Sequence, residues 1–145
     1  MESVIKGIAH SAYTVQDMES AVAFYEKVFG FKKAFTMNHP KTGSPWIVYL
    51  YVAENQFIEL FYGGIKEDPY SDDRIGYSHL CLEVRDIQEA AAAVLAAGAP
   101  LDAKPSMGID GNWQCWTHDP DGNRIELMQM MPGSLQDRYQ QLKKD

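Results

Sequence analysis

Apolar residues recur at helical spacing in two stretches, one in each half of the chain. Between Met18 and Phe29, and again between Ile87 and Val94, they fall three and four residues apart, which predicts two amphipathic helices. An aspartate precedes each stretch as an N-cap candidate, and a glycine follows each where a left-handed residue ends a helix. These four residues are Asp17, Asp86, Gly30 and Gly98.

β-branched and aromatic residues dominate the segments around these helices, and turn sequences separate the segments. A strand candidate precedes each helix, ending at Val15 in the first half and at Val84 in the second. After the first helix the runs are FKKAFTM, WIVYLYV and FIELFY; after the second they are a short piece near Leu101, NWQCWTH and RIELMQM. Each half therefore has the order β-α-β-β-β, and the fold class is α+β. A short C-terminal helix behind Ser134 is predicted over about 134–143.

The two halves also repeat short sequence motifs at nearly constant spacing. His10 opens HSAYTVQD, and His79 opens HLCLEVRD 69 positions later. An Ile-Glu-Leu triplet around Glu59 returns around Glu126 after 67 positions, as one shortened loop would produce. Two matches in the same order indicate an internal duplication. We expect one domain over residues 1–145, built from a module at about 4–64 and a second at about 75–130.

Composition limits the partners of the chain. A formal net charge of −7 with no basic stripe argues against nucleic acid, and no run approaches the roughly 20 apolar residues of a membrane helix. The N-terminal residues lack the basic start and apolar run of an export signal, so a cytoplasmic location is predicted. Cys81 and Cys115 are then expected as reduced thiols that pack in the fold. His39 and His118 fall in turn-rich segments and are expected in solvent.

Four potential metal ligands occupy equivalent positions of the repeat, namely His10, Glu59, His79 and Glu126. Each lies on a predicted strand, where side chains alternate between faces, so each points away from the aliphatic neighbours that a helix covers. Taken singly, each glutamate fits a solvent-exposed strand face, and each histidine fits an ordinary core or surface position. Together, two imidazoles and two carboxylates suit one divalent ion: Ni²⁺, Co²⁺, Mn²⁺, Fe²⁺ or Zn²⁺.

The same alternation predicts what surrounds this metal site. Aromatic and sulfur side chains are candidates to line a substrate pocket, although plain core packing explains each of them singly at least as well. These are Phe57, Phe61, Tyr77, Trp113, Trp116 and Met128. Arg124 stands two residues before Glu126, and its cation either binds a substrate carboxylate or lies in water at the sheet edge.

Three segments carry a family resemblance: HSAYTVQDMESAVAFYEKVFGF from His10, SHLCLEV around His79, and DPDGNRIEL around Glu126. Over about residues 4–130 the chain resembles the vicinal oxygen chelate superfamily of glyoxalases, bleomycin-resistance proteins and extradiol dioxygenases. The resemblance implies two tandem βαβββ modules whose curved mixed sheets enclose one metal. It also implies a small-molecule substrate and a homodimer.

The full His-Glu-His-Glu set is similar to that of glyoxalase I, which isomerises the hemithioacetal of methylglyoxal and glutathione. This resemblance implies a metal that acts as a Lewis acid, with Glu126 as the base that moves the proton and Glu59 as its alternative. Thr14 and Gly63 stand where bacterial relatives commonly carry the arginine and asparagine that hold glutathione. A different thiol or carbonyl substrate, an epimerase, a thiol transferase, and a non-catalytic small-molecule or antibiotic-binding protein remain as alternatives.

Overall fold

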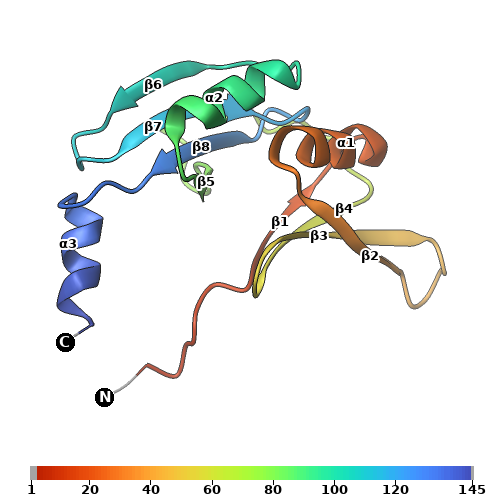
Figure 1. Ribbon diagram of the computed structural model, residues 1–145. Helices are drawn as coiled ribbons and strands as arrows, with labels where there is room; N and C mark the ends of the chain where they lie inside the picture. The colour runs from red at the N-terminus through yellow and green to blue at the C-terminus, as the bar shows by residue number, and fades with distance from the viewer. Residues whose placement is uncertain (1–2, 145) are drawn as a thin grey trace. The chain divides into compact units, whose positions relative to one another are not determined.

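Each half of the chain forms a four-stranded mixed sheet with a helix packed against it. The computed structural model describes residues 3–144, and these divide into two units between Glu67 and Asp68. In Figure 1 the first unit runs from red to yellow-green and the second from green to blue. Both units have the order β-α-β-β-β, so the predicted α+β class with two βαβββ modules is confirmed.

Five elements build the first unit: β1 (His10–Thr14), α1 (Met18–Phe29), β2 (Lys32–Asn38), β3 (Pro45–Ala53) and β4 (Gln56–Phe61). The strand order in its sheet is β1-β4-β3-β2. β1 runs parallel to β4, and β2, β3 and β4 form antiparallel hairpins. A parallel pair requires a crossover connection, and α1 lies in that connection and contacts the sheet.

Six elements build the second unit: β5 (Leu80–Glu83), α2 (Ile87–Ala96), β6 (Ala103–Met107), β7 (Trp113–His118), β8 (Arg124–Gln129) and α3 (Leu135–Leu142). The strand order is β5-β8-β7-β6, which repeats the order of the first sheet. β5 is parallel to β8, and the other pairs are antiparallel. α2 packs against β6, β7 and β8 (Figure 1).

The helices begin and end near the residues predicted to cap them. Asp17 and Asp86 each accept a hydrogen bond from the backbone N–H three residues on, at 2.7 Å and 2.9 Å. Gly30 and Gly98 follow the two long helices with left-handed φ angles of 71° and 79°, which glycine adopts without a steric penalty from Cβ. Ser134 caps α3 as predicted. Among residues 3–144 no helix has both the length and the apolar character needed to cross a membrane.

The alternation of side chains along the strands gives each sheet a core face and an open face. The core face of each sheet carries its most deeply buried aliphatic strand residues, which are 0–2% exposed: Val48, Leu50, Ile58, Leu60, Ile125 and Leu127. Ala21 and Tyr25 of α1 are equally inaccessible, as is Val94 of α2. Glu59 and Glu126 alternate with these aliphatic residues and therefore belong to the opposite faces of their sheets.

Two strand boundaries differ from the predicted ones. β5 begins at Leu80, where its pairing with Ile125 of β8 begins, so His79 precedes the strand instead of lying within it. β6 begins at Ala103 rather than near Leu101. Just before it, Pro100 has no N–H to donate, and its carbonyl accepts a hydrogen bond from Thr117 Oγ1 at 2.7 Å.

Candidate metal centre

His10 and Glu59 form the candidate pair of the first unit. The parallel pairing of β1 and β4 places His10 beside Phe57 and Ala12 beside Glu59. The imidazole Nε2 of His10 lies 2.9 Å from Oε2 of Glu59. The histidine side chain is 46% exposed and the glutamate side chain only 8%. A carboxylate this deeply buried is costly without partners, so the imidazole stabilises it where water is scarce.

Tyr49 provides a second partner for Glu59 that the sequence analysis did not identify. It stands opposite Glu59 in the β3–β4 hairpin, and its phenol O–H donates a hydrogen bond to the carboxylate. This hydrogen bond, followed by desolvation and the negative charge of Glu59, raises the pKa of Tyr49, because ionisation would remove the donor. The phenol ring also stacks on Phe35, with the ring centroids 4.3 Å apart.

His79 and Glu126 form the equivalent pair of the second unit. Nε2 of His79 lies 3.0 Å from Oε2 of Glu126, and the glutamate side chain is 16% exposed. The other ring nitrogen of His79, Nδ1, is hydrogen-bonded to the hydroxyl of Ser78 at 2.9 Å. A hydrogen bond at the second nitrogen fixes the orientation of a histidine, as metal-binding histidines commonly require.

Cys81 is the second neighbour of Glu126. β5 and β8 pair these two residues directly, and the thiol lies within hydrogen-bonding reach of the carboxylate. Desolvation, and then the negative charge of Glu126, raises the pKa of the Cys81 thiol to about 12, so the thiol stays protonated at neutral pH. Both Cys81 and Cys115 are free cysteines. Cys115 is fully buried, whereas Cys81 is exposed and contacts a candidate ligand instead of packing in the core.

The predicted pocket residues are divided between the two sheet faces. Phe57 and Phe61 alternate with Ile58 and Leu60, so both share the face of Glu59. In the second unit, Trp116 pairs directly with Glu126, whereas Trp113 pairs with Gln129 on the other face. Trp116 is therefore the tryptophan beside the candidate ligand.

Three further predicted residues belong to the second unit. Met128 shares the face of Glu126, is 8% exposed, and accepts a hydrogen bond on Sδ from Asn112 at 3.4 Å. Tyr77 lies in the loop before β5, where its carbonyl accepts a hydrogen bond from Arg74 at 3.0 Å. Arg124 lies with its guanidinium carbon 4.7 Å from the ring centre of Trp116.

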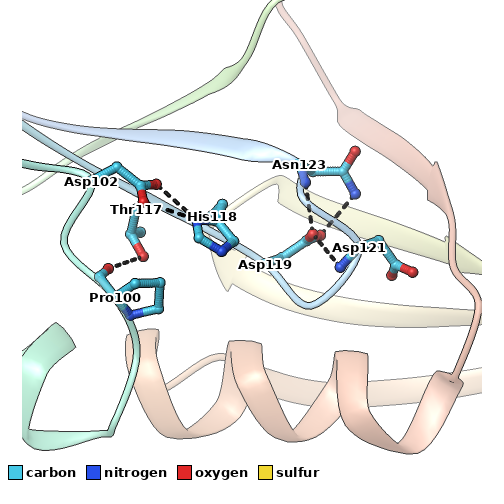
Figure 2. A network of polar contacts seen from close by, with 7 residues as sticks. All are labelled: Pro100, Asp102, Thr117, His118, Asp119, Asp121 and Asn123. Carbon is cyan, nitrogen blue, oxygen red and sulfur yellow. Dashed lines mark hydrogen bonds and ion pairs between the residues drawn. The ribbon is translucent and has the colours of Figure 1, made fainter. Parts of the chain in front are cut away.

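The DPDGN turn sets the start of β8 and hence the position of Glu126. Asp119, which is only 1% exposed, accepts hydrogen bonds from the backbone N–H groups of Asp121 and Asn123 at 3.0 and 2.9 Å. Its second oxygen accepts a hydrogen bond from the Asn123 side-chain amide at 2.9 Å (Figure 2). Because a buried carboxylate organises this turn, the pairing of His118 with Arg124 just beyond it is well defined.

The two remaining histidines also have partners within the fold. His118 is the last residue of β7, and its Nδ1 lies 2.8 Å from the carboxylate of Asp102 (Figure 2). The expectation of a simply solvated His118 was therefore incomplete, although both side chains of this pair are about 40% exposed. His39 packs edge-on against Trp46, and its Nδ1 accepts a hydrogen bond from the backbone of Lys41 at 3.2 Å. Within residues 3–144 no ion pair joins either histidine to a candidate ligand.

The structure thus brings each candidate histidine to its candidate glutamate. Among residues 3–144 no three His, Cys, Asp or Glu side chains converge as a metal-binding group, so the four predicted ligands appear as two pairs. In each pair an imidazole nitrogen and a carboxylate oxygen approach each other closely. This N/O donor set fits a divalent first-row transition-metal ion, which prefers imidazole and carboxylate ligands.

Comparison with known proteins identifies relatives for most of the chain. Residues 7–127 match the family model of the Glyoxalase/Bleomycin resistance protein/Dioxygenase superfamily. The chain is 30% identical over 126 residues to lactoylglutathione lyase of Escherichia coli O157:H7, covering 84% of this chain and 91% of that protein. It is 26% identical over 149 residues to metallothiol transferase FosB of Lysinibacillus sphaericus, covering 97% and 92%.

Two further relatives bear on length and fold. Lactoylglutathione lyase GLX1 of Arabidopsis thaliana is 27% identical over 127 residues, which make up 85% of this chain but only 44% of the plant protein. The chain therefore spans less than half the length of that relative. A crystal structure of a glyoxylase/bleomycin resistance protein/dioxygenase domain from Frankia sp. EAN1pec superposes with a TM-score of 0.72 at 20% identity, covering 89% and 95% of the two chains. At this identity the likeness concerns the fold alone.

Proposed function

The chain belongs to the Glyoxalase/Bleomycin resistance protein/Dioxygenase superfamily, and from this premise we propose that it is a divalent-metal-dependent enzyme of the glyoxalase I type. Its substrate is a hemithioacetal formed from a thiol and a 2-oxoaldehyde. One proton leaves the carbon bonded to sulfur and a proton arrives at the neighbouring carbon, while the hydroxyl and carbonyl exchange places. The product is a 2-hydroxy thioester, so the reaction is an isomerisation that conserves every atom.

The observation that supports this proposal is the recurrence of one His–Glu contact in both units. Nε2 and Oε2 lie 2.9 Å apart for His10 and Glu59, and 3.0 Å apart for His79 and Glu126. We propose that the four side chains together hold one ion.

Such an ion supplies Lewis acidity, which stabilises negative charge when a proton leaves the carbon beside a carbonyl. The histidines and the glutamates of the protein then have different roles. The two histidines hold their Nε2 atoms toward the carboxylates, and the hydroxyl of Ser78 keeps the ring of His79 in that orientation. One of the two carboxylates takes the proton from the first carbon and returns it to the second.

Glu126 is the better candidate for this base. Glu59 accepts a hydrogen bond from the phenol of Tyr49, whereas the second neighbour of Glu126 is the Cys81 thiol, which is a weak donor. The Glu126 side chain is also twice as exposed as that of Glu59. A carboxylate with weaker partners and more room changes position more readily, as a base that reaches two neighbouring carbons must.

Metal stoichiometry tests the shared site without reference to activity. The full chain is stripped of metal, reloaded separately with Ni²⁺, Co²⁺, Mn²⁺, Fe²⁺ or Zn²⁺, and analysed by elemental mass spectrometry. We expect one ion per chain, and we expect both His10→Ala and His79→Ala to release it. Two ions per chain, or full retention in either variant, would contradict a site made of all four ligands.

Turnover tests the reaction and the identity of the base. The assay follows isomerisation of the methylglyoxal–glutathione hemithioacetal by each metal-loaded form, with Glu126→Gln and Glu59→Gln as a matched pair. We expect Glu126→Gln to lower kcat by at least about a hundredfold, as the loss of a general base does, while metal remains bound. Unchanged turnover in Glu126→Gln would refute its role, and loss only in Glu59→Gln would transfer that role to Glu59.

The thiol partner is open to a second test, because the chain lacks the two expected glutathione contacts. Thr14 replaces the arginine, and Gly63 replaces the asparagine with a φ of 97°, a left-handed conformation that strains most side chains. We therefore propose that a thiol other than glutathione is an equally suitable partner, and the assay includes cysteine, coenzyme A and 3-mercaptopropionate. The homodimer and the cytoplasmic location stay predictions; light scattering of the purified chain tests the first.

A further inference from the structure

Arg124 combines a buried donor with an incomplete set of partners. Its guanidinium carbon lies 4.0 Å from the ring centre of Tyr70 and 4.7 Å from that of Trp116. Its Nη1 atom is buried and has no hydrogen-bond partner in the described chain. The two rings pack against the guanidinium but do not accept a hydrogen bond from Nη1. Burying an unpaired donor of a permanently charged group costs free energy.

Arg74 of the same unit also has a buried nitrogen without a hydrogen-bond partner, Nε, but both of its terminal nitrogens have partners within the chain. Its Nη1 forms an ion pair with Asp68, and its Nη2 donates to the carbonyl of Tyr77 at 3.0 Å. Among residues 3–144 no carboxylate forms an ion pair with Arg124, although the chain carries a net charge of −7. The position opposite Arg124 in the hairpin belongs to His118, which is paired with Asp102. An acceptor for Arg124 is therefore expected from outside the protein.

The position of Arg124 connects it to the candidate base. Strand residues two apart share a face and lie about 7 Å apart, so Arg124 is on the face of Glu126. Trp116 stands opposite Glu126 in the β7–β8 pairing, and its ring centre lies 4.7 Å from the guanidinium carbon of Arg124. The same ring lies edge-on to His79, with the ring centroids 4.6 Å apart. A ligand that reaches Glu126 with its reacting carbon can therefore present a charged group to Arg124.

We propose that Arg124 is a specificity residue that binds a carboxylate of the substrate a few bonds away from the carbon that loses its proton. The guanidinium matches a carboxylate with two parallel N–H···O hydrogen bonds, and Tyr70 and Trp116 hold its plane. This inference rests on the proposed isomerisation, and it narrows the substrate to hemithioacetals with an anionic thiol-derived arm.

Equilibrium binding of an unreactive pair tests the charge preference. The probes are 3-(methylthio)propionate and its neutral methyl ester, titrated into the metal-loaded full chain and followed by backbone amide NMR shifts of β7 and β8. We expect the acid to bind at least about tenfold more tightly than the ester, as one charge-assisted contact provides. Arg124→Met should remove this preference, whereas Arg85→Met, at an exposed arginine of the same unit, should retain it.

Turnover of the matching hemithioacetals separates this inference from the proposed function. Methylglyoxal is combined with 3-mercaptopropionate or with its methyl ester, and we expect Arg124→Met to raise KM for the acid about tenfold with little change for the ester. Arg124→Lys, which keeps the charge without the planar fork, should show part of the preference and serves if the methionine variant folds poorly.

Three outcomes distinguish the possibilities. Equal binding of acid and ester by the unaltered protein, or a preference that survives in Arg124→Met, would overturn the inference even if both hemithioacetals turn over. An Arg124-dependent preference without turnover of either hemithioacetal would support the anion site and contradict the proposed isomerisation. A preference in both binding and KM that depends on Arg124 supports both.

Discussion

The carboxylate of Asp119 offers a sharp test of how local bonding positions the candidate site. The perturbation is Asp119→Ala, which removes all three hydrogen bonds that Asp121 and Asn123 donate to this side chain (Figure 2). The turn then loses the group that links its two ends directly before β8. Because Arg124 and Glu126 follow immediately, both stability and the candidate site should respond.

The magnitude follows from the burial and number of these bonds. Asp119 is 1% exposed, and hydrogen bonds to a charged group contribute about 1.5–3 kcal/mol each. Asp121 is exposed and Asn123 half-buried, so water replaces part of the lost bonding. We therefore expect a loss of about 2–4 kcal/mol in the free energy of unfolding. Asp119→Asn keeps an acceptor for the two backbone N–H groups, so we expect it to lower the free energy of unfolding by only about 1 kcal/mol. Asn123→Ala removes one hydrogen bond and should lower it by a similar amount.

Urea unfolding monitored by tryptophan fluorescence measures this series. The chain has three tryptophans, and in a Trp46→Phe background the remaining Trp113 and Trp116 both lie in β7 and report on the second unit. The m-value must stay constant for the midpoint shift to be interpreted as a change in stability. A loss below about 0.5 kcal/mol for Asp119→Ala, or an equal loss for all three variants, would refute the account of this turn.

Two further predictions concern the first unit. In Gly64→Ala the new Cβ would lie 2.8 Å from the carbonyl oxygen of Val15, so the backbone must shift. We expect the free energy of unfolding, measured by thermal unfolding, to fall by about 1–3 kcal/mol. The control Gly7→Ala meets no atom within 4 Å and should change stability little, and equal effects of the two would contradict the steric argument. Hydrogen bonds from Ser20 hold the pKa of Asp17 below its ordinary value of 3.8. The charge of Asp17 therefore stabilises α1 above that pH, and this stabilisation disappears as the pH falls through the lower pKa of the folded state. The test compares the free energy of unfolding of the unaltered protein and of Asp17→Asn, measured by urea unfolding from about pH 7 down to about pH 3. We expect the difference between the two proteins to shrink only at the acid end. A difference that stays constant with pH would refute this role of the Asp17 charge.

Local patterns were sufficient to predict most of the elements. Helix periodicity and capping depend on residues within one or two turns of each other, so both long helices begin where Asp17 and Asp86 indicate. The β7–β8 register also follows by counting outward from the DPDGN turn, which sets Trp116 opposite Glu126. The same register sets Trp113 opposite Gln129, on the other face of the sheet.

Counting fails in the first unit because of an irregularity that the sequence does not mark. A register shift between Tyr51 and Ala53 moves the pairing of β3 with β4 by one residue. Without it Glu59 would face Leu50; with it Glu59 faces Tyr49, which supplies the phenol donor. A bulge of this kind depends on how the two strands twist and pack, so it appears only in the folded sheet.

Repeated motifs and strand alternation are local and periodic, so the sequence was enough to predict the duplication, the order of elements, and one candidate histidine and one candidate glutamate in each module. The folded structure was needed to show which other groups meet those glutamates and Arg124. Tyr49 reaches Glu59 through a shifted register, Cys81 reaches Glu126 through a parallel strand pair, and Tyr70 reaches Arg124 from a loop 54 residues earlier. Such contacts join segments far apart in the chain, and their geometry depends on packing that no short stretch of sequence encodes.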